Sequence, residues 1–431
     1  MKSLVLVLLV AAACAKHEDY IGWKTYFVGP STTDQFKDLA VMVPVFELDF
    51  LSRPIIGREG LVLVKPEHQD SFTKALEEKG ITYYIHADNI KERLDIDDEA
   101  IEAQNKLTMS RSGFRKPFDN YQPLEVYDNY LEDIARRFPN IATLVTPANS
   151  FEGHPIKYLK ISTTDFQDRR KPVIVIDGGI HSREWISPPT VAYAIRKLTE
   201  DLTETEMLHN YDWILLPIVN PDGYKFSFER ARFWRKTRST DHAQGQNCPG
   251  VDGNRNYDFF WNTVGSSSWP CHDTFAGSRP FSEVETRVVR DILHEHLERI
   301  TLYITMHSFG SLILYSWGHN GSFSHNAFAL HVVGVNMADA IFNATLPHFP
   351  RYTVGNAGLS PVLLASGAAE DYAHYIGVPL SYTFELPGVF TSGTGFGGFT
   401  IHPRYIEQVC KETWAAIAVG ARRSAEMFGK K

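Results

Sequence analysis

The sequence predicts an α/β protein: a mixed, mainly parallel twisted sheet with helices on both faces, preceded by a small α+β domain. Three observations lead to this fold class. The chain of 431 residues is 43% hydrophobic and 13% aromatic, which is enough to bury a large core. From about residue 121 onward, short apolar runs alternate with helix-like segments, a pattern typical of strands buried on both faces. Before residue 111, charged residues and glutamine replace the later aromatics and glycines.

The N-terminus has the pattern of a secretory signal. Lys2 gives a positive start, residues 3–10 are apolar, and Ala13-Cys14-Ala15 supplies the small-x-small cleavage pattern. A buried N-terminal strand or helix is the alternative interpretation. Because the apolar run is too short for a membrane anchor, we expect residues 1–15 to be removed and the protein to be secreted and extracellular.

Residues 16–111 predict the small α+β domain. An apolar strand at 61–66 leads into a helix that Gly80 ends, a β-rich run follows at 81–87, and the charged segment 89–107 is helical in pattern. The next residues, "MSRSGFRKP", contain Arg111 and Arg115 in a small-residue setting that proteases favour. This segment is either an ordinary linker or a trypsin-like activation site, and residues 112–431 form the second domain.

Charge and cysteine content narrow the class of protein. A formal charge of −8 and a pI near 6.1 argue against a nucleic-acid partner, and we expect no membrane partner. Signal removal leaves three cysteines, of which Cys248 and Cys271 bracket a loop and should pair in an oxidising compartment. That disulfide is worth about 3 kcal/mol. Cys410 lies in a helix-like pattern and is expected to be a buried free thiol.

Two tripeptides match the pattern for N-glycosylation. They begin at Asn320 and Asn343. Such tripeptides are common, so glycosylation at each position stays open.

Four apolar runs of the second domain end in a polar residue: Asp177, Asn220, His307 and Glu385. In open α/β sheets, ligands bind beyond the carboxyl ends of the strands. We therefore expect these four residues to share one site.

The stretch "GGIHSREWISPP" places His181 and Glu184 directly after the buried run 173–177. A His₂Glu set with an open fourth position is a known catalytic zinc site, and His307 is the leading third ligand. The H-x-x-E spacing alone is a weak signal, and a hydrogen-bonded core histidine is the alternative for His307. In contrast, His294 and His296 would point to different faces of a helix, and we expect both to be solvated.

A hydrolytic zinc site also needs a base and a group that recognises the substrate. Glu385 ends an aromatic, β-branched run, where a buried acid must meet a cation or move a proton. Arg232, Arg235 and Arg255 gather in two nearby motifs, which suggests a pocket for an anionic group. A solvated surface cluster is the alternative for these arginines.

Together these features resemble the pancreatic-type zinc carboxypeptidases, the A/B branch of the metallocarboxypeptidases, in zymogen form. The motifs that carry the resemblance occur in the family's order: "GGIHSREWISP", "VNPDGY", "RFWRKTR", "CPGVDGNRNYDFFW", "ITMHSFG" and "TFEL". It covers most of the chain, from the signal and pro-domain to the catalytic domain.

The resemblance implies one Zn²⁺ per chain, held by His181, Glu184 and His307. Glu385 would activate the hydrolytic water and then protonate the leaving amine, while Arg235 would stabilise the oxyanion. The resemblance assigns the remaining substrate and supporting contacts as follows: the C-terminal carboxylate to Asn254 and Arg255, the upstream peptide to Arg183, and the orientation of His181 to Asp252. The partners are peptide or protein C-termini, the protein's own inhibitory pro-domain and an activating trypsin-like protease.

The chain departs from the family pattern at two tyrosine positions, where it has Leu363 and Phe309. The resemblance places Glu370 at the floor of the pocket for the terminal side chain, with Gly318 and Gly358 on its walls. A carboxylate there favours basic ends, with Lys ahead of Arg because Glu reaches further than Asp.

Three alternatives to this assignment stay open. The first is an A-like preference with Glu370 turned outward, and the second is a non-catalytic peptide-binding relative. A prohormone-processing type is less favoured, because no extra β-domain follows the last helix pattern. A digestive role is an expectation by analogy alone.

Overall fold

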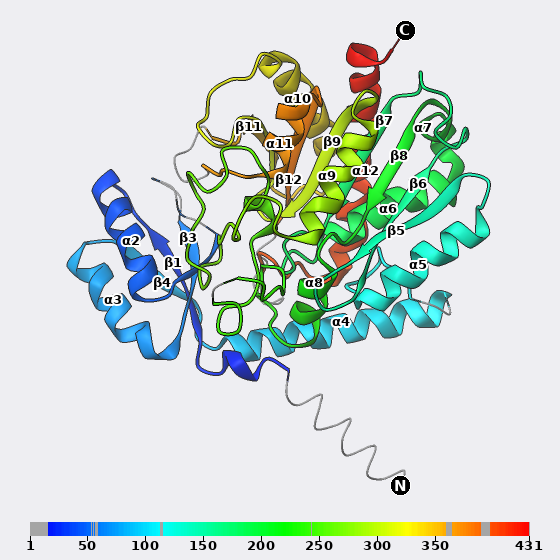
Figure 1. Cartoon of the computed structure of the whole chain (residues 1–431). Helices are drawn as coiled ribbons and strands as arrows, with labels where there is room; N and C mark the ends of the chain where they lie inside the picture. Colours follow the sequence, from blue (N-terminus) through cyan, green and yellow to red (C-terminus); the bar gives the residue numbers. More distant parts are fainter. Residues whose placement is uncertain are drawn as a thin grey trace.

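The computed structural model describes residues 16–430, except 53, 55, 57–58, 113–114, 243, 359–363 and 389–396. The predicted signal and Leu363 lie outside the described residues. The chain folds into a small N-terminal domain, a long connecting helix and a large α/β domain (Figure 1).

The small domain is a four-stranded antiparallel sheet with helices, as the sequence predicted. Its strands are arranged in the order β2-β3-β1-β4. The element bounds are β1 Lys24–Gly29, α2 Thr33–Val45, β2 Asp49–Ser52, β3 Gly60–Val64, α3 Gln69–Glu78 and β4 Thr82–Ala87. Gly80 follows α3 with φ of 63°, a conformation that glycine adopts at little cost, so the helix ends where the sequence indicated.

Helix α4, Ile90–Ser112, links the two domains and runs along the large one (Figure 1). Arg111 lies at its C-terminal end, and Arg115 follows as an exposed residue. The expected activation segment thus begins inside a helix and continues past it.

The large domain is built on an eight-stranded mixed sheet in the order β11-β10-β12-β9-β7-β8-β6-β5. Its four central strands, β12, β9, β7 and β8, are parallel. The strands are β5 Ala142–Asn149, β6 Pro155–Ile161, β7 Val173–Gly178, β8 Asp212–Leu216, β9 Ile300–Ser308, β10 Leu312–Tyr315, β11 Thr353–Asn356 and β12 Leu380–Leu386.

Helices cover both faces of this sheet. The helices are α5 Leu124–Arg137, α6 Ser187–Thr199, α7 Thr205–Asn210, α8 Pro221–Glu229, α9 Val284–His296, α10 Ala327–Ala344, α11 Ala369–Ile376 and α12 Ile406–Phe428. The first four residues of β7 are all apolar because each face packs on helices: Ile174 and Ile176 join the core with α6 and α12, whereas Val173 and Val175 join the core with α9 and α11. The predicted fold class is confirmed.

Among the described helices, α10 is long and apolar enough to cross a membrane by length and composition. Its buried side chains, including Leu330, Val333 and Met337, belong to the same core as α12. Core helices of soluble domains pass the same test.

Candidate metal centre and substrate cleft

The predicted metal ligands converge at the carboxyl ends of β7 and β9. His181 and Glu184 lie on the turn between β7 and α6, and His307 is the penultimate residue of β9. The Nδ1 atoms of His181 and His307 are 3.0 Å apart, and the Glu184 carboxylate lies 2.8 Å from the first and 3.0 Å from the second. All three side chains are buried.

This donor set fits a metal cation. Nε2 of His181 lies 2.9 Å from Oδ1 of buried Asp252, so its N–H donates there and Nδ1 keeps a lone pair. That lone pair faces the Glu184 carboxylate, an arrangement of two acceptors that a cation between them would satisfy. Nitrogen and oxygen donors of this kind suit zinc. Burial alone would raise the pKa of Glu184, but the two imidazoles hold it well below its usual range.

Asp252 also binds Arg235, which places the guanidinium beside the metal ligands. Nε and Nη2 of Arg235 donate to Oδ2 of Asp252 at 3.1 and 2.9 Å, and Nη1 lies 3.8 Å from Glu184. Burial would raise the pKa of Asp252, but Arg235 and His181 keep it well below its usual range. One carboxylate thus orients both a metal ligand and a cation.

Glu385 faces the same centre from the neighbouring strand. It pairs with His307 in the parallel register of β12 and β9. Burial, reinforced by the charge of Glu184, raises the pKa of Glu385 to about 7. A carboxyl group with this proton affinity can both take and return a proton near neutral pH.

A cavity of about 670 Å³ extends from the metal ligands toward α11. Asn254 and Arg255 line it, and both come from the short helix η4, Gly253–Arg255. The Oδ1 atom of Asn254 accepts from the amide of Ala369, and Arg255 donates to the carbonyls of Gly265 and Asn254. These bonds fix an amide and a guanidinium in the wall of the cavity.

Glu370 also lines this cavity. It lies in the first turn of α11, is only 4% exposed, and its Oε2 has no hydrogen-bond partner among the described residues. Burial, followed by the charge of neighbouring Asp371, raises the pKa of Glu370 to about 7. The carboxylate at this position therefore points inward, as the sequence predicted.

Asp371 is fully buried and held by backbone donors. The amide of Gly318 donates to both its oxygens at 2.9 Å, and the amide of His319 donates at 3.1 Å. Gly318 thus lies just behind the cavity, where an added Cβ would meet Asp371 and the cavity-lining Ala357. The sequence analysis missed Asp371, although the acid pair in "AAEDY" was a visible signal.

The N-terminal domain closes the cleft from the opposite side. Helix α2 and strand β2 line the cavity, and Asp49 of β2 accepts from Nη1 of Arg183 at 3.0 Å through both oxygens. Arg183 is buried and also lies 3.4 Å from Asp273 of the large domain. The residue predicted to contact substrate is thus covered by Asp49, which no local sequence signal would have revealed.

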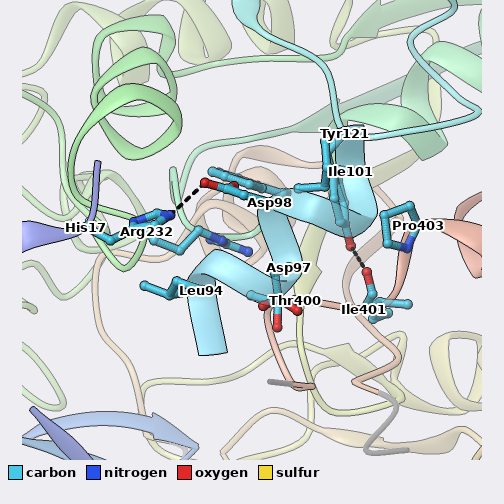
Figure 2. Close-up of a pocket in the computed structure, with 11 residues that line it drawn as sticks. His17, Leu94, Asp97, Asp98, Ile101, Tyr121, Arg232, Thr400, Ile401 and Pro403 are labelled. Carbon is cyan, nitrogen blue, oxygen red and sulfur yellow. Dashed lines mark hydrogen bonds and ion pairs between the residues drawn. The ribbon is translucent and has the colours of Figure 1, made fainter. Parts of the chain in front are cut away.

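A second contact joins the N-terminal segment and α4 to the large domain (Figure 2). The side-chain amide of Asn120 donates to the carbonyl of Ile101 of α4 at 2.8 Å, and the amide of Phe233 donates to the hydroxyl of Tyr20 at 3.1 Å. Arg232 is buried here over the ring of Trp185. It donates to the carbonyls of Arg183 and Phe399. The prediction that Arg232 belongs to an anion pocket is wrong, because its guanidinium donates to backbone carbonyls instead.

Two of the four polar strand ends do not reach the site. Asp177 is buried in the sheet and accepts from Tyr303 and Thr305. Asn220 lies beyond β8, caps α8 and donates to the carbonyls of Ile180 and Lys236. The expectation of a shared site is therefore wrong for these two, whose hydrogen bonds fix the strands and turns around it.

The structure also bears on the cysteines and on the two candidate glycosylation sites. Cys248 and Cys271 form a disulfide, and Cys410 is a buried free thiol. Asn320 and Asn343 are both exposed.

The two histidines at the end of α9 differ in their surroundings. His294 is exposed beside the Tyr372 hydroxyl, but His296 is half-buried against Phe166, so the solvated assignment is wrong for His296.

Comparison with known proteins decides the family. The model of the family described as "Zinc carboxypeptidase" matches residues 127–416, and the model described as "Carboxypeptidase activation peptide" matches residues 26–97. The chain belongs to the zinc carboxypeptidase family. The activation peptide makes it a zymogen of this metallopeptidase family, with the N-terminal domain as its own inhibitor.

Individual relatives agree with this assignment. Carboxypeptidase B of Helicoverpa zea is 59% identical over 432 residues, covering 100% of both chains. Carboxypeptidase B of Rattus norvegicus is 31% identical over 427 residues, covering 97% of each. The crystal structure of carboxypeptidase A from Helicoverpa armigera is 42% identical with a TM-score of 0.90, covering 96% of this chain and 100% of that one.

Proposed function

We propose that this zinc carboxypeptidase zymogen is secreted and, once activated, removes basic residues from peptide C-termini, with Lys ahead of Arg. The observation that carries the specificity is the buried carboxylate of Glu370 in the cavity lining, whose Oε2 has no hydrogen-bond partner among the described residues. A cationic side chain would supply the missing partner, and a charge-assisted bond in a buried pocket discriminates strongly against neutral side chains. The 59% identical relative carries the name carboxypeptidase B.

The residues of the cavity suggest how the substrate is held. The guanidinium of Arg255 and the side-chain amide of Asn254 line the same cavity as the candidate metal ligands and Glu370. A C-terminal carboxylate bound there would let the last side chain reach Glu370 and would exclude internal peptide bonds. Cleavage is therefore limited to the terminal residue.

His181, Glu184 and His307 would hold one zinc ion, with Asp252 orienting His181. When bound, zinc supplies a Lewis acid that polarises the scissile carbonyl and acidifies water. Glu385 takes a proton from the water as the water oxygen bonds to the carbonyl carbon. Arg235 stabilises the negative charge that develops on the carbonyl oxygen.

Breakdown of the tetrahedral adduct completes the reaction. The C–N bond breaks, and Glu385 returns its proton to the leaving nitrogen. The products are a free amino acid and a peptide one residue shorter. A pKa of Glu385 near 7 suits both proton transfers.

Activation requires release of the N-terminal domain that covers Arg183. We propose cleavage by a trypsin-like protease at Arg111 or Arg115, of which Arg115 is exposed just after α4. N-terminal sequencing of the secreted and the trypsin-treated protein tests both points. We expect the secreted chain to start at Lys16 and the active form to start after one of the two arginines.

Specificity is tested with the activated enzyme and matched peptides ending in Lys, Arg, Phe or Leu. We expect kcat/KM for Lys and Arg to exceed that for Phe and Leu by at least about tenfold, roughly 1.4 kcal/mol of transition-state binding. Faster release of Phe or Leu would show an A-like enzyme. No hydrolysis of any peptide by the zinc-loaded protein would show a non-catalytic binder.

A further inference from the structure

The lining of the proposed specificity pocket includes an acid, Glu370, and a second acid, Asp371, follows it directly in the chain. Glu370 and Asp371 are adjacent and nearly inaccessible to solvent. Asp371 accepts hydrogen bonds from the amides of Gly318 and His319. Oε2 of Glu370 has no partner among the described residues. A second negative charge beside the first is therefore opposed by both burial and repulsion.

Charged groups face Glu370 from several elements. Asp371 of α11 opposes its ionisation, whereas His307 of β9 and, to a smaller extent, Thr383 of β12 favour it. Glu385 of β12 and Arg255 of η4 also interact with Glu370 electrostatically. The hydrogen bonds of Arg255 go to the carbonyls of Gly265 and Asn254. Arg255 thus has other partners, and the balance favours proton uptake, in line with the raised pKa of Glu370.

We infer that protonation of Glu370 switches the specificity of the enzyme, so that basic C-terminal residues are preferred only when Glu370 is ionised and uncharged residues compete when it is protonated. A protonated carboxyl group lacks the charge that attracts an ammonium group, but it can lie against an aliphatic or thioether side chain at little cost. This inference deepens the proposed basic preference and rests on it.

The test compares kcat/KM for two substrates as a ratio, because the ionisation of any group that affects both substrates equally then cancels. The full chain is expressed, loaded with zinc and activated by trypsin. The value of kcat/KM is then measured from about pH 5.5 to 9 for two blocked dipeptides that differ only in ending with Lys or Met. Lys stays protonated over this range because its ordinary pKa is about 10.4. Ionisation of Glu385 and of the metal ligands affects both substrates and cancels in the Lys/Met ratio.

We expect the Lys/Met ratio to be constant at high pH and to fall about tenfold per pH unit below an inflection. That inflection should lie at least about one unit above the ordinary glutamate value of roughly 4.3. The Glu370→Gln variant should have a low ratio that does not change with pH. A slope that persists in Glu370→Gln would assign the switch to another group and overturn the inference.

Glu412 offers a matched control. It is a buried glutamate of α12 whose pKa burial also raises to about 7, and it does not line the cavity. Glu412→Gln is the same chemical change at a remote place and should leave the pH profile of the ratio as in the wild type. A changed profile would show that the effect is not specific to the pocket and would overturn the inference.

The outcomes separate this inference from the proposed function. A wild-type ratio below one at every pH, unchanged in Glu370→Gln, contradicts the basic preference itself. A ratio well above one that Glu370→Gln abolishes, but that stays flat across the pH range, keeps the basic preference and overturns only the switch.

Discussion

Latency of the uncut chain should depend on the contact between Asp49 and Arg183. The Asp49→Asn substitution keeps the shape of the side chain and removes its charge. Both Asp49 oxygens lie 3.0 Å from Nη1 of Arg183, whose side chain is 4% exposed, whereas that of Asp49 is 23% exposed. A hydrogen bond to a charged group is worth about 1.5–3 kcal/mol. Because Asp273 at 3.4 Å still compensates Arg183, we take the lower end, about 1.5 kcal/mol.

That loss should raise about tenfold the fraction of uncut molecules in which the N-terminal domain has moved away from the cleft. The assay compares hydrolysis by the uncut protein, free of protease, with hydrolysis by the same sample after activation. The activated forms are identical, so their activities should agree. Asp38→Asn is the control, because Asp38 pairs with Lys79 inside the N-terminal domain. Basal activity of Asp49→Asn within about twofold of both wild type and Asp38→Asn would refute the reasoning.

Three further predictions concern stability and chemistry. The folded-state pKa of Glu412 is about 7, above the unfolded value of about 4.3, so the native state loses stability as pH rises between these values. The free energy of unfolding of Glu412→Gln, taken relative to that of the wild type at the same pH, should therefore be up to about 3 kcal/mol more favourable at pH 8 than at pH 4.5. Denaturant titrations measure it, and an equal difference at both pH values would contradict this. Replacing Cys248 and Cys271 by serine opens a disulfide of sequence separation 23 and should cost about 3 kcal/mol, checked by the same titration; an unchanged midpoint would count against the bond. Chelation should abolish hydrolysis and added zinc should restore it, while Glu385→Gln should keep about one zinc per chain by metal analysis yet lose at least about a hundredfold in kcat; retained activity would exclude Glu385 as the base.

Local signals in the sequence predicted the fold and the three side chains that cluster as a candidate metal centre. The run at 173–176 is apolar on both faces because helices cover both sides of β7, and such a run is visible without a structure. His181, Glu184 and His307 lie at the ends of such runs, and the parallel pairing of β7 with β9 brings them together. Spacing and strand ends were sufficient here because the sheet fixes the geometry.

Contacts between distant segments could not be predicted in the same way. Asp49 reaches Arg183 from another domain, so nothing in either local pattern indicates the pair. Arg232 shares the motif of Arg235, but its guanidinium turns inward toward two carbonyls. The polarity of Asp177 is likewise used inside the sheet, by Tyr303. These charged residues have the chemistry of functional groups, but the packing of distant segments determines which partners their side chains contact.

The central claim is that Glu370 sets the preference for basic residues, and one substitution tests it most directly. The ratio of kcat/KM for peptides ending in Lys and in Leu is measured at pH 8 for the activated wild type and for Glu370→Leu. An apolar floor should bind Leu and leave a buried ammonium group unpaired, so we predict that the ratio falls from well above one to below one. A ratio that stays above one in Glu370→Leu would contradict the account.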